Sequence, residues 1–274
     1  MNPEKPPGFA WGFTKIGTKR RVKMKLKDRV AIVTGASRGM GRGIAIRLAE
    51  EGARILAIDI ETEELKKTGE MVKEKGGEIL TMRVDVSSEE DTRSMVEAAE
   101  SEFGRIDILV NNAAVFAGMK PKPFYEYELE EWQKHINVTV LGQWLCAKAV
   151  FPYMKKQNKG KIINIASSAA FKPLVGYMPY TVCKAAVIGL NRLLAAELGE
   201  YNINVNNISP GSISTEALYT LMSEDDAEKR AMAGVIKRVG QVSDIVGMVV
   251  FLASDDSDFI TGQSMIIDGG RQMR

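Results

Sequence analysis

The segment of residues 30–45 constrains the fold of this chain more than any other. It joins a β-branched run, residues 30–33, to glycines at positions 35, 39, 41 and 43 and to an apolar-periodic segment that starts at Met40. This pattern is typical of a buried parallel strand, a tight turn and a helix. Glycine lets the backbone turn sharply and lets a ligand approach the main chain, and the unpaired N–H groups at a helix start suit a pyrophosphate.

The glycine spacing alone leaves two interpretations open. Gly35-x-x-x-Gly39-x-Gly41 differs from the G-x-G-x-x-G spacing that is usual for dinucleotide folds. The same turn contains Gly35-x-Ser37-x-Gly39, which fits the G-x-S-x-G nucleophile elbow of α/β-hydrolases. A hydrolase would need a base near Ser37, but the single histidine, His135, falls within a long predicted helix. That elbow also follows several earlier strands, whereas this one follows the first. The order of elements therefore disfavours the hydrolase.

The rest of the chain alternates between strand-like and helix-like segments. Strand–helix alternation with nearly continuous apolar strands predicts a parallel sheet covered on both faces. We therefore expect an α/β protein: a single Rossmann-type domain over residues 28–274, with a doubly wound parallel sheet of about seven strands. The expected strands are 29–34, 54–58, 78–84, 106–111, 160–166, 203–208 and 264–267, and the expected helices are 40–52, 62–75, 88–103, 126–156, 178–199 and 241–253.

Small or polar residues follow six of the predicted strands. In open α/β sheets the ligand lies at the carboxyl ends of the strands, so these residues predict a cleft. Asp59 ends the second strand, 24 residues after Gly35. A carboxylate at that place can accept both ribose hydroxyls of an adenosine and would repel a 2′-phosphate. The other strand ends carry Asp85-Val86, Asn111-Asn112-Ala113-Ala114, Ser167-Ser168 and Pro210-Gly211.

Charge and composition exclude several classes of protein. Residues 1–27 hold eight lysines and arginines and one acid, whereas the remaining residues hold 29 basic and 34 acidic side chains. The mildly acidic body disfavours a nucleic-acid surface. No apolar run is long enough for a signal peptide or a membrane span, so no membrane partner is expected. Cys146 and Cys183 fall in apolar segments and are expected to be reduced core thiols of a cytoplasmic protein. With one histidine and no C-x-x-C, no metal site is expected.

The first 27 residues are interpreted as a basic N-terminal extension. They are rich in proline, glycine and lysine, with Phe9, Trp11 and Phe13 near the front. A solvated extension, docking of the aromatics on a neighbouring subunit and a mitochondrial presequence all remain open.

Tyr180 and Lys184 form the candidate acid/base pair. Their spacing of four puts both side chains on one face of a helix. An ammonium close to a phenol favours the phenolate, so Lys184 is expected to lower the pKa of Tyr180 toward the working pH. Such a pair is also common as a purely structural contact.

These residues together resemble the classical short-chain dehydrogenase/reductase family over essentially all of residues 28–270. The segment 34–41 resembles its cofactor turn, 111–114 its N-N-A-G segment, Pro210-Gly211 with Thr215 its nicotinamide-side segment, and 268–270 its usual ending. Ala114 departs from the family, which usually has glycine there. This methyl group narrows the floor of the cleft and puts the shape of the substrate in question.

The resemblance implies a set of site residues. The catalytic tetrad would be Asn137, Ser167, Tyr180 and Lys184, with Ser167 preferred to Ser168 by its separation from the tyrosine and Tyr180 preferred to Tyr177 by the lysine four residues on. In these roles Tyr180 exchanges the alcohol proton, Ser167 orients the substrate oxygen, Lys184 holds the nicotinamide ribose and Asn137 anchors a water. The cofactor-binding residues would be Gly35, Ser37, Arg38, Gly39, Met40, Gly41, Asp59, Asp85, Val86, Asn112, Ala113, Tyr180, Lys184, Pro210, Gly211, Ile213 and Thr215.

The expected function is interconversion of a secondary alcohol and a ketone with NAD(H). Asp59 favours NAD over NADP, although Arg38 inside the turn could pair with a 2′-phosphate. The segment 216–232, where the family carries a lid, adds apolar residues to Phe116, Met119, Phe171, Leu174 and Tyr177. These residues either form an apolar pocket, which predicts an aromatic or alicyclic substrate, or only pack the lid on the body of the domain. An NADPH-dependent 3-oxoacyl thioester reductase and a catalytically silent cofactor-sensing regulator are the alternatives. The resemblance also implies a homotetramer formed through the two long helices and the last strand.

Overall fold

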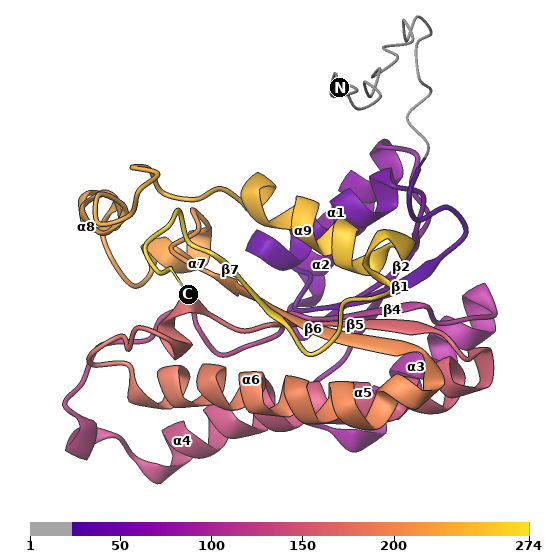
Figure 1. Ribbon diagram of the computed structural model, residues 1–274, viewed down its shortest axis with the longest axis horizontal. Coiled ribbons are helices and arrows are strands. Elements are labelled where there is room, and N and C mark those ends of the chain that lie inside the picture. Colours follow the sequence, from indigo (N-terminus) through magenta and orange to yellow (C-terminus); the bar gives the residue numbers. More distant parts are fainter. Residues whose placement is uncertain (1–23, 274) are drawn as a thin grey trace, which may run out of the picture.

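A seven-stranded parallel sheet runs through the centre of the computed structural model, which describes residues 24–273 (Figure 1). The strand order is β3-β2-β1-β4-β5-β6-β7, and all neighbouring strands pair in parallel. All seven predicted strands are confirmed, each within a few residues of its expected ends. They are β1 (Val30–Thr34), β2 (Arg54–Asp59), β3 (Ile79–Arg83), β4 (Ile108–Asn111), β5 (Gly160–Ile165), β6 (Ile203–Pro210) and β7 (Ser264–Ile267).

Helices cover both faces of the sheet, as predicted. The helices α1, α2 and α9 lie on one face, and α3, α4, α5 and α6 lie on the other (Figure 1). The segment that the resemblance assigns to a lid contains α7 and α8. The helices are α1 (Gly39–Glu50), α2 (Thr62–Glu74), α3 (Glu89–Phe103), α4 (Leu129–His135), α5 (Gly142–Gln157), α6 (Met178–Leu198), α7 (Glu216–Tyr219), α8 (Glu224–Ala231) and α9 (Val242–Ala253).

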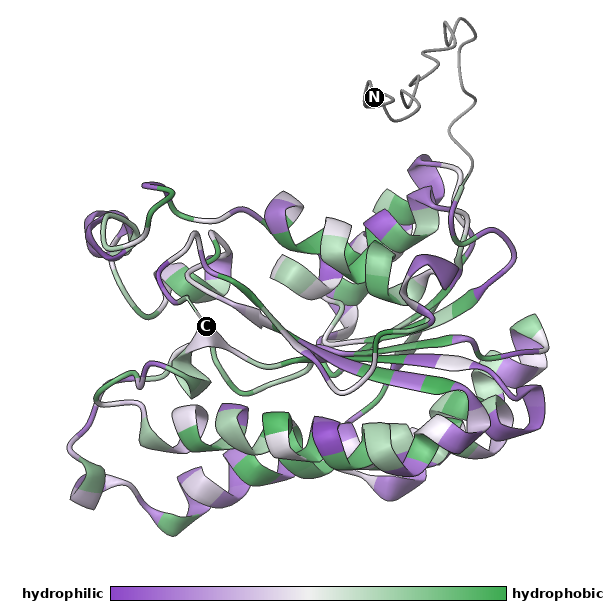
Figure 2. Ribbon diagram, viewed as in Figure 1, coloured by the Kyte–Doolittle hydropathy of each residue, from purple (hydrophilic) through white to green (hydrophobic). Residues whose placement is uncertain are grey.

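Alternate residues of each central strand fill two separate apolar layers. Ala31 and Val33 of β1 pack in the layer beneath α1 and α9, whereas Val30 and Ile32 pack in the layer beneath α3 and α5. Figure 2 shows apolar residues along the strands between the two layers of helices. Burial on both faces explains why the strands are continuous apolar runs rather than alternating ones. Leu26, just before the predicted domain start, is also buried in the first layer.

The helical segment predicted at residues 126–156 is not one regular α-helix. A π-helical turn at Ile136–Leu141 joins α4 to α5. Turns of this kind are rare and often occur at functional sites. Neither periodicity nor composition distinguishes such a turn from ordinary helix, so the sequence did not reveal it.

The order of the strands fixes where a ligand can bind. The chain moves outward from β1 through β2 to β3 and then returns to place β4 on the other side of β1. The two connections therefore leave the sheet in opposite directions, and a crevice opens at the carboxyl ends of β1 and β4. The glycine turn follows β1 directly at this point.

Candidate active site

The glycine turn after β1 is so tight that two of its glycines have no substitute. Gly35 has a φ of 64°, in the left-handed region that favours glycine. A Cβ atom added to Gly41 would lie 1.9 Å from the carbonyl oxygen of Gly35. Because α1 begins inside the turn, its first N–H groups stand beside this backbone.

Asn112, at the end of β4, clamps the turn from one side. Its Nδ2 donates to the carbonyl oxygens of Thr34 at 3.0 Å and of Gly35 at 2.9 Å. In return, Oγ1 of Thr34 accepts hydrogen bonds from the backbone N–H groups of Asn112 and Ala113, both at 2.9 Å. The Asn112 side chain thus shapes the turn.

Arg42, on α1, clamps the turn from the other side. Its guanidinium donates to the carbonyl oxygen of Ser37, to Oε2 of Glu64 at 2.8 Å and to Oγ1 of Thr68 at 3.0 Å. Oγ1 of Thr68 donates in turn to the carbonyl oxygen of Ala36 at 2.9 Å. The backbone of the turn is therefore held by the end of β4 on one side and by α1 and α2 on the other.

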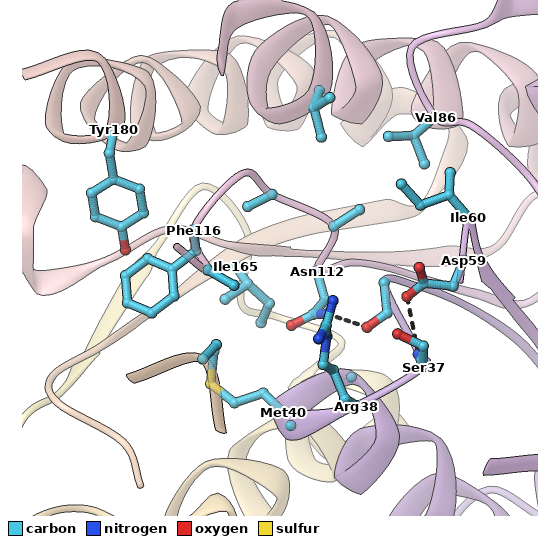
Figure 3. Close-up of a pocket in the computed structure, with 18 of the residues that line it drawn as sticks. Ser37, Arg38, Met40, Asp59, Ile60, Val86, Asn112, Phe116, Ile165 and Tyr180 are labelled. Atoms are coloured by element: carbon cyan, nitrogen blue, oxygen red, sulfur yellow. Dashed lines mark hydrogen bonds between the residues drawn. The ribbon is translucent and has the colours of Figure 1, made fainter. Parts of the chain in front are cut away.

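Asp59, at the end of β2, lies beside the turn. Its Oδ2 accepts a hydrogen bond from the backbone N–H of Ser37 at 3.0 Å, and its Oδ1 accepts one from Glu61 at 3.1 Å. The carboxylate lines the same cavity as Arg38 (Figure 3). Within residues 24–273, Arg38 forms no ion pair. At this end of the cavity, the Asp59 carboxylate is fixed by the backbone and the Arg38 guanidinium has no ion-pair partner among the described residues.

Lys184 is buried near Tyr180 on α6. The side chains of Tyr180 and Lys184 are 8% and 3% exposed, and Nζ of Lys184 lies 5.9 Å from the centre of the tyrosine ring. Nζ donates a hydrogen bond to the carbonyl oxygen of Ile165 at 2.6 Å. Burial disfavours the ammonium and lowers the pKa of Lys184 to about 8.

The predicted lowering of the Tyr180 pKa is wrong for this structure. Burial of the phenol raises its pKa, and a hydrogen bond with the hydroxyl of Ser167 opposes this effect only in part. Lys184 is close, but the loss of water around the phenol has the larger effect. Ser167 is itself positioned by the backbone, since its Oγ accepts a hydrogen bond from the N–H of Ala169 at 3.1 Å.

Asn137 lies in the π-helical turn and lines the cavity. Its Oδ1 accepts a hydrogen bond from Nε2 of Gln133 at 2.7 Å. Glu130, Gln133 and Lys134 of α4 also line the cavity, and sequence reasoning missed them. Their positions three, four and seven residues before Asn137 were the available signal, because such positions share one face of a helix.

One cavity of about 720 Å³ brings all the predicted site residues together. Every residue named above as catalytic or cofactor-binding lines it. Figure 3 labels several of them, among them Arg38, Asp59 and Tyr180. The set fits a dinucleotide: backbone N–H groups and glycines for a pyrophosphate, and a carboxylate for a ribose. Further residues that line it and were not predicted as site residues are Ile60, Glu61, Val84, Ser87, Ala117, Val138, Ile165 and Ala166.

The apolar residues predicted to form a substrate pocket have different locations. Ala114, Phe116 and Leu218 line the cavity, and the ring of Phe116 lies 5.2 Å from that of Tyr180. The residues Met119, Leu174 and Tyr177 pack with Tyr180 without lining the cavity. Phe171 packs instead in a separate cluster with Ala166, Val187 and Ile188.

The carboxyl-terminal segment reaches the loop that carries the candidate serine. Nε2 of Gln272 donates to the carbonyl oxygen of Ser168 at 3.0 Å and to Oδ2 of Asp268 at 3.3 Å. The residue after Ser167 is therefore tied to the end of the chain. No feature of the sequence pointed to this contact.

The remaining expectations concern metals, membranes and thiols. Cys146 and Cys183 are buried free thiols, as predicted. Within residues 24–273, no cluster of three or more acidic, cysteine or histidine side chains is arranged to bind a metal, and no helix has the length and apolarity needed to cross a membrane. The solitary His135 is buried, and burial lowers its pKa. Phe9, Trp11 and Phe13 lie outside the described residues.

Comparison with known proteins extends over nearly the whole domain. A family model described as Enoyl-(Acyl carrier protein) reductase matches residues 35–272. The (2S)-[(R)-hydroxy(phenyl)methyl]succinyl-CoA dehydrogenase subunit BbsD of Thauera aromatica is 36% identical over 250 residues, which cover 91% of this chain and 99% of that protein.

Two of the similar solved structures are complexes with a nicotinamide cofactor. A 7α-hydroxysteroid dehydrogenase complexed with NADH and 7-oxo glycochenodeoxycholic acid superimposes with a TM-score of 0.86 at 32% identity, covering 92% of this chain and 98% of that one. Carveol dehydrogenase from Mycobacterium avium in complex with NAD gives 0.84 at 33% identity, covering 90% and 98%.

Proposed function

This chain belongs to the short-chain dehydrogenase/reductase family and is an oxidoreductase that acts on CH–OH groups, and from that premise we propose that it interconverts a secondary alcohol and a ketone with NAD(H). The proposal includes the tetrad Asn137, Ser167, Tyr180 and Lys184. The observation that carries it is that these four side chains, the glycine turn and Asp59 line a single cavity at the switch point of the sheet.

The proposed cofactor is NAD rather than NADP. The carboxylate of Asp59 stands where an adenosine ribose would lie, and a 2′-phosphate beside it would meet like-charge repulsion. The free guanidinium of Arg38 favours the alternative. The 7α-hydroxysteroid and carveol dehydrogenase structures contain NADH and NAD, which supports NAD for this chain.

When bound, the nicotinamide gives or accepts the hydride, and the proposed roles of the protein are to place the substrate and to move the proton. Tyr180 exchanges a proton with the substrate oxygen, and Ser167 donates a hydrogen bond to the same oxygen. The ammonium of Lys184 holds the nicotinamide ribose hydroxyls. Asn137 orients a water that connects this site to solvent. Positioning of this kind turns a bimolecular reaction into an effectively unimolecular one.

The buried environment of Tyr180 suits the reductive direction at neutral pH. A phenol whose pKa is raised by burial keeps its proton and can donate it to a ketone oxygen as charge develops there. The hydrogen bond with Ser167 opposes that rise and so helps the phenolate when an alcohol is oxidised.

For the substrate, we favour an apolar aromatic or alicyclic ketone or alcohol. The apolar side chains of Ala114, Phe116 and Leu218 on the walls of the cavity support this class. The names of the similar proteins include a steroid, a terpene alcohol and a phenyl-substituted acyl-CoA. The last of these also supports the second candidate, a 3-oxoacyl thioester reduced with NADPH.

A panel of substrates with both nicotinamides tests this proposal. We expect alicyclic and aryl ketones to be reduced with NADH at a kcat/KM at least about tenfold above that of acetoacetyl-CoA with NADPH. The opposite order would select the second candidate. An absence of turnover with every ketone, thioester and alcohol would contradict the proposed activity.

Replacing Tyr180 by phenylalanine separates chemistry from binding. Tyr180→Phe removes the proton donor and keeps the ring, so kcat should fall by about a thousandfold or more while NADH affinity stays within about twofold. Tyr177→Phe is the matched control, because Tyr177 is equally buried and packs in the same cluster. If both variants kept their turnover, the proposed tetrad would be wrong.

Two further properties are part of the proposal. Trp144 of α5 and Val182 and Leu193 of α6 are large apolar side chains exposed to solvent, which supports burial between subunits of a homotetramer. Sedimentation equilibrium of the purified protein measures this directly. The two buried free thiols support a cytoplasmic location.

A further inference from the structure

A second, smaller cavity lies next to the active site and has no role in the proposed reaction. Its volume is about 240 Å³, and it shares Gly211 and Ile213 with the main cavity. The segment 211–213 after β6 therefore forms a common wall. The other walls come from the end of α8, the segment 234–240 and the residues that follow β7.

Three arginines, Arg230, Arg238 and Arg271, line this second cavity together with the carboxylates of Asp244 and Asp268. Arg238 is neutralised, because its guanidinium donates to both carboxylate oxygens of Asp244 at 2.7 and 2.8 Å. This ion pair lowers the pKa of Asp244 to about 2. Arg238 and Asp244 therefore leave no net charge for a ligand.

Both carboxylate oxygens of Asp268 already accept hydrogen bonds. Its Oδ1 accepts a hydrogen bond from the backbone N–H of Arg271 at 3.0 Å, and its Oδ2 accepts one from Nε2 of Gln272 at 3.3 Å. Neither contact uses the guanidinium of Arg271. The carboxylates that line the cavity are thus engaged with other donors.

The guanidinium groups of Arg230 and Arg271 have no ion-pair partner within residues 24–273. The Nε atom of Arg271 is fully buried and has no hydrogen-bond acceptor. Buried donors in folded proteins almost always have a partner, and a planar guanidinium is best matched by the paired oxygens of a carboxylate or phosphate. Asp268 has only neutral hydrogen-bond donors among the described residues and keeps its negative charge, so Arg230 and Arg271 leave the lining of the cavity with one net positive charge.

We propose that this second cavity, between α8, the segment 211–213 and the carboxyl-terminal residues, binds a small oxyanion, a carboxylate or a phosphate group. The guanidinium groups of Arg230 and Arg271 supply the charge. The site is distinct from the glycine turn, which is the place for a pyrophosphate in the proposed function. Its common wall with the active site allows an anion there to act on the proposed reaction.

Titration calorimetry with inorganic phosphate tests the proposal. The protein is saturated with NADH, so that the glycine turn is occupied, and chloride at equal ionic strength serves as the blank. We expect one saturable phosphate site per chain, with an affinity reduced at least about tenfold in Arg230→Ala and in Arg271→Gln. Lys229→Ala is the matched control, because it removes the same charge from the neighbouring position of α8 and does not line the cavity.

The outcomes separate this proposal from the proposed function. No saturable phosphate binding, or equal binding in the wild type and both arginine variants, would overturn it. If NADH did not bind, the proposed cofactor would be wrong, yet the comparison of the three variants would still decide the anion site. Arg230 lies on the lid helix α8 away from the core, so a folding defect of Arg271→Gln would leave Arg230→Ala as an informative variant.

A second titration identifies the source of the anion. Phosphate affinity is measured again with acetoacetyl-CoA present and with its uncharged N-acetylcysteamine thioester present. Loss of phosphate binding with the CoA thioester alone would assign the site to an acidic arm of the substrate. Unchanged binding in both cases would assign it to a free anion. Either result agrees with an oxyanion site.

Discussion

The two halves of the active-site cavity are built in different ways. The half proposed for the cofactor is a backbone turn held by Asn112 on one side and by Arg42 on the other. The half proposed for the substrate has Ala114, Phe116 and Leu218 in its walls. Leu218 belongs to the lid segment 216–232, which contains the four-residue helix α7 and the eight-residue helix α8. Met232 at the end of this lid is 52% exposed, and Val235 just after it is 64% exposed.

Hydrogen bonds to the main chain fix the geometry of the cofactor half, whereas side chains on loops fix the geometry of the substrate half. A turn whose carbonyl groups are all hydrogen-bonded has one conformation, so it can serve a ligand that never changes. A lid with few buried contacts opens at low free-energy cost and tolerates substitution. One fold can therefore keep its cofactor while its substrate varies.

The largest expected effect is that of Gly41→Ala, in the fixed half. The new Cβ would meet the carbonyl oxygen of Gly35 at 1.9 Å, so the turn must open. We expect a loss of about 4 kcal/mol or more in the free energy of unfolding and no measurable NADH binding. Urea denaturation and fluorescence titration measure the two effects.

Gly189→Ala, in α6, is the control for that variant. No atom lies within 4 Å of a Cβ added there, so stability should stay unchanged or rise by about 0.5–1 kcal/mol. A Gly41→Ala protein as stable and as tightly NADH-binding as Gly189→Ala would show that the turn is not rigid.

Lys184→Met tests the cost of the buried ammonium. Because folding lowers the pKa of Lys184 from 10.5 to about 8, the folded protein resists the charged form. The penalty is complete below pH 8 and disappears as pH rises through 10.5, so wild-type stability should increase between these values. At pH 7 the variant, which loses a hydrogen bond to Ile165, should be more stable by about 2 kcal/mol and inactive.

Urea denaturation at pH 7 and pH 10, with activity assayed in parallel, checks this prediction. Lys229→Met is the control, since that side chain is exposed on α8. A Lys184→Met protein less stable than wild type at pH 7 would mean that contacts within the fold stabilise the ammonium by more than its burial destabilises it.

Asp59→Asn tests the electrostatic basis of cofactor choice at the edge of the fixed half. The amide keeps an oxygen for the Ser37 N–H but loses the negative charge. The ratio of kcat/KM with NADPH to that with NADH should rise by about tenfold or more. Glu63→Gln, on the exposed face of α2, should leave the ratio unchanged. An equal rise of this ratio in both variants would mean that the net charge of the protein, and not the carboxylate of Asp59, sets the cofactor preference.

The smallest effect is expected just after the lid, at Val235. Val235→Ser removes an exposed apolar side chain, so the free energy of unfolding should change by less than about 0.5 kcal/mol and NADH affinity by less than about twofold. Thermal denaturation and the NADH titration above measure both. A loss of NADH affinity comparable to that expected for Gly41→Ala would contradict the division into two halves.

The sequence predicts what depends on local pattern and misses what depends on packing. The apolar run 30–33 and the glycines after it predicted β1, the turn and α1, because strand period and glycine geometry are local properties. The burial of Tyr180, which reverses the expected direction of its pKa, depends on Phe116 and other residues far away in the chain. The same is true of the second cavity, where Arg230 and Arg271 meet.

The hydrogen bond from Gln272 to the carbonyl of Ser168 makes the carboxyl end of this chain a poor place for an affinity tag or a fusion partner. A group attached there lies next to this hydrogen bond and is expected to disturb the loop beside the candidate serine. The turn that contains Leu26 directly precedes β1 and so lies at the amino ends of the strands, whereas the cavity lies at their carboxyl ends. Immobilising the enzyme through its amino-terminal side is expected to leave the loop beside the candidate serine undisturbed.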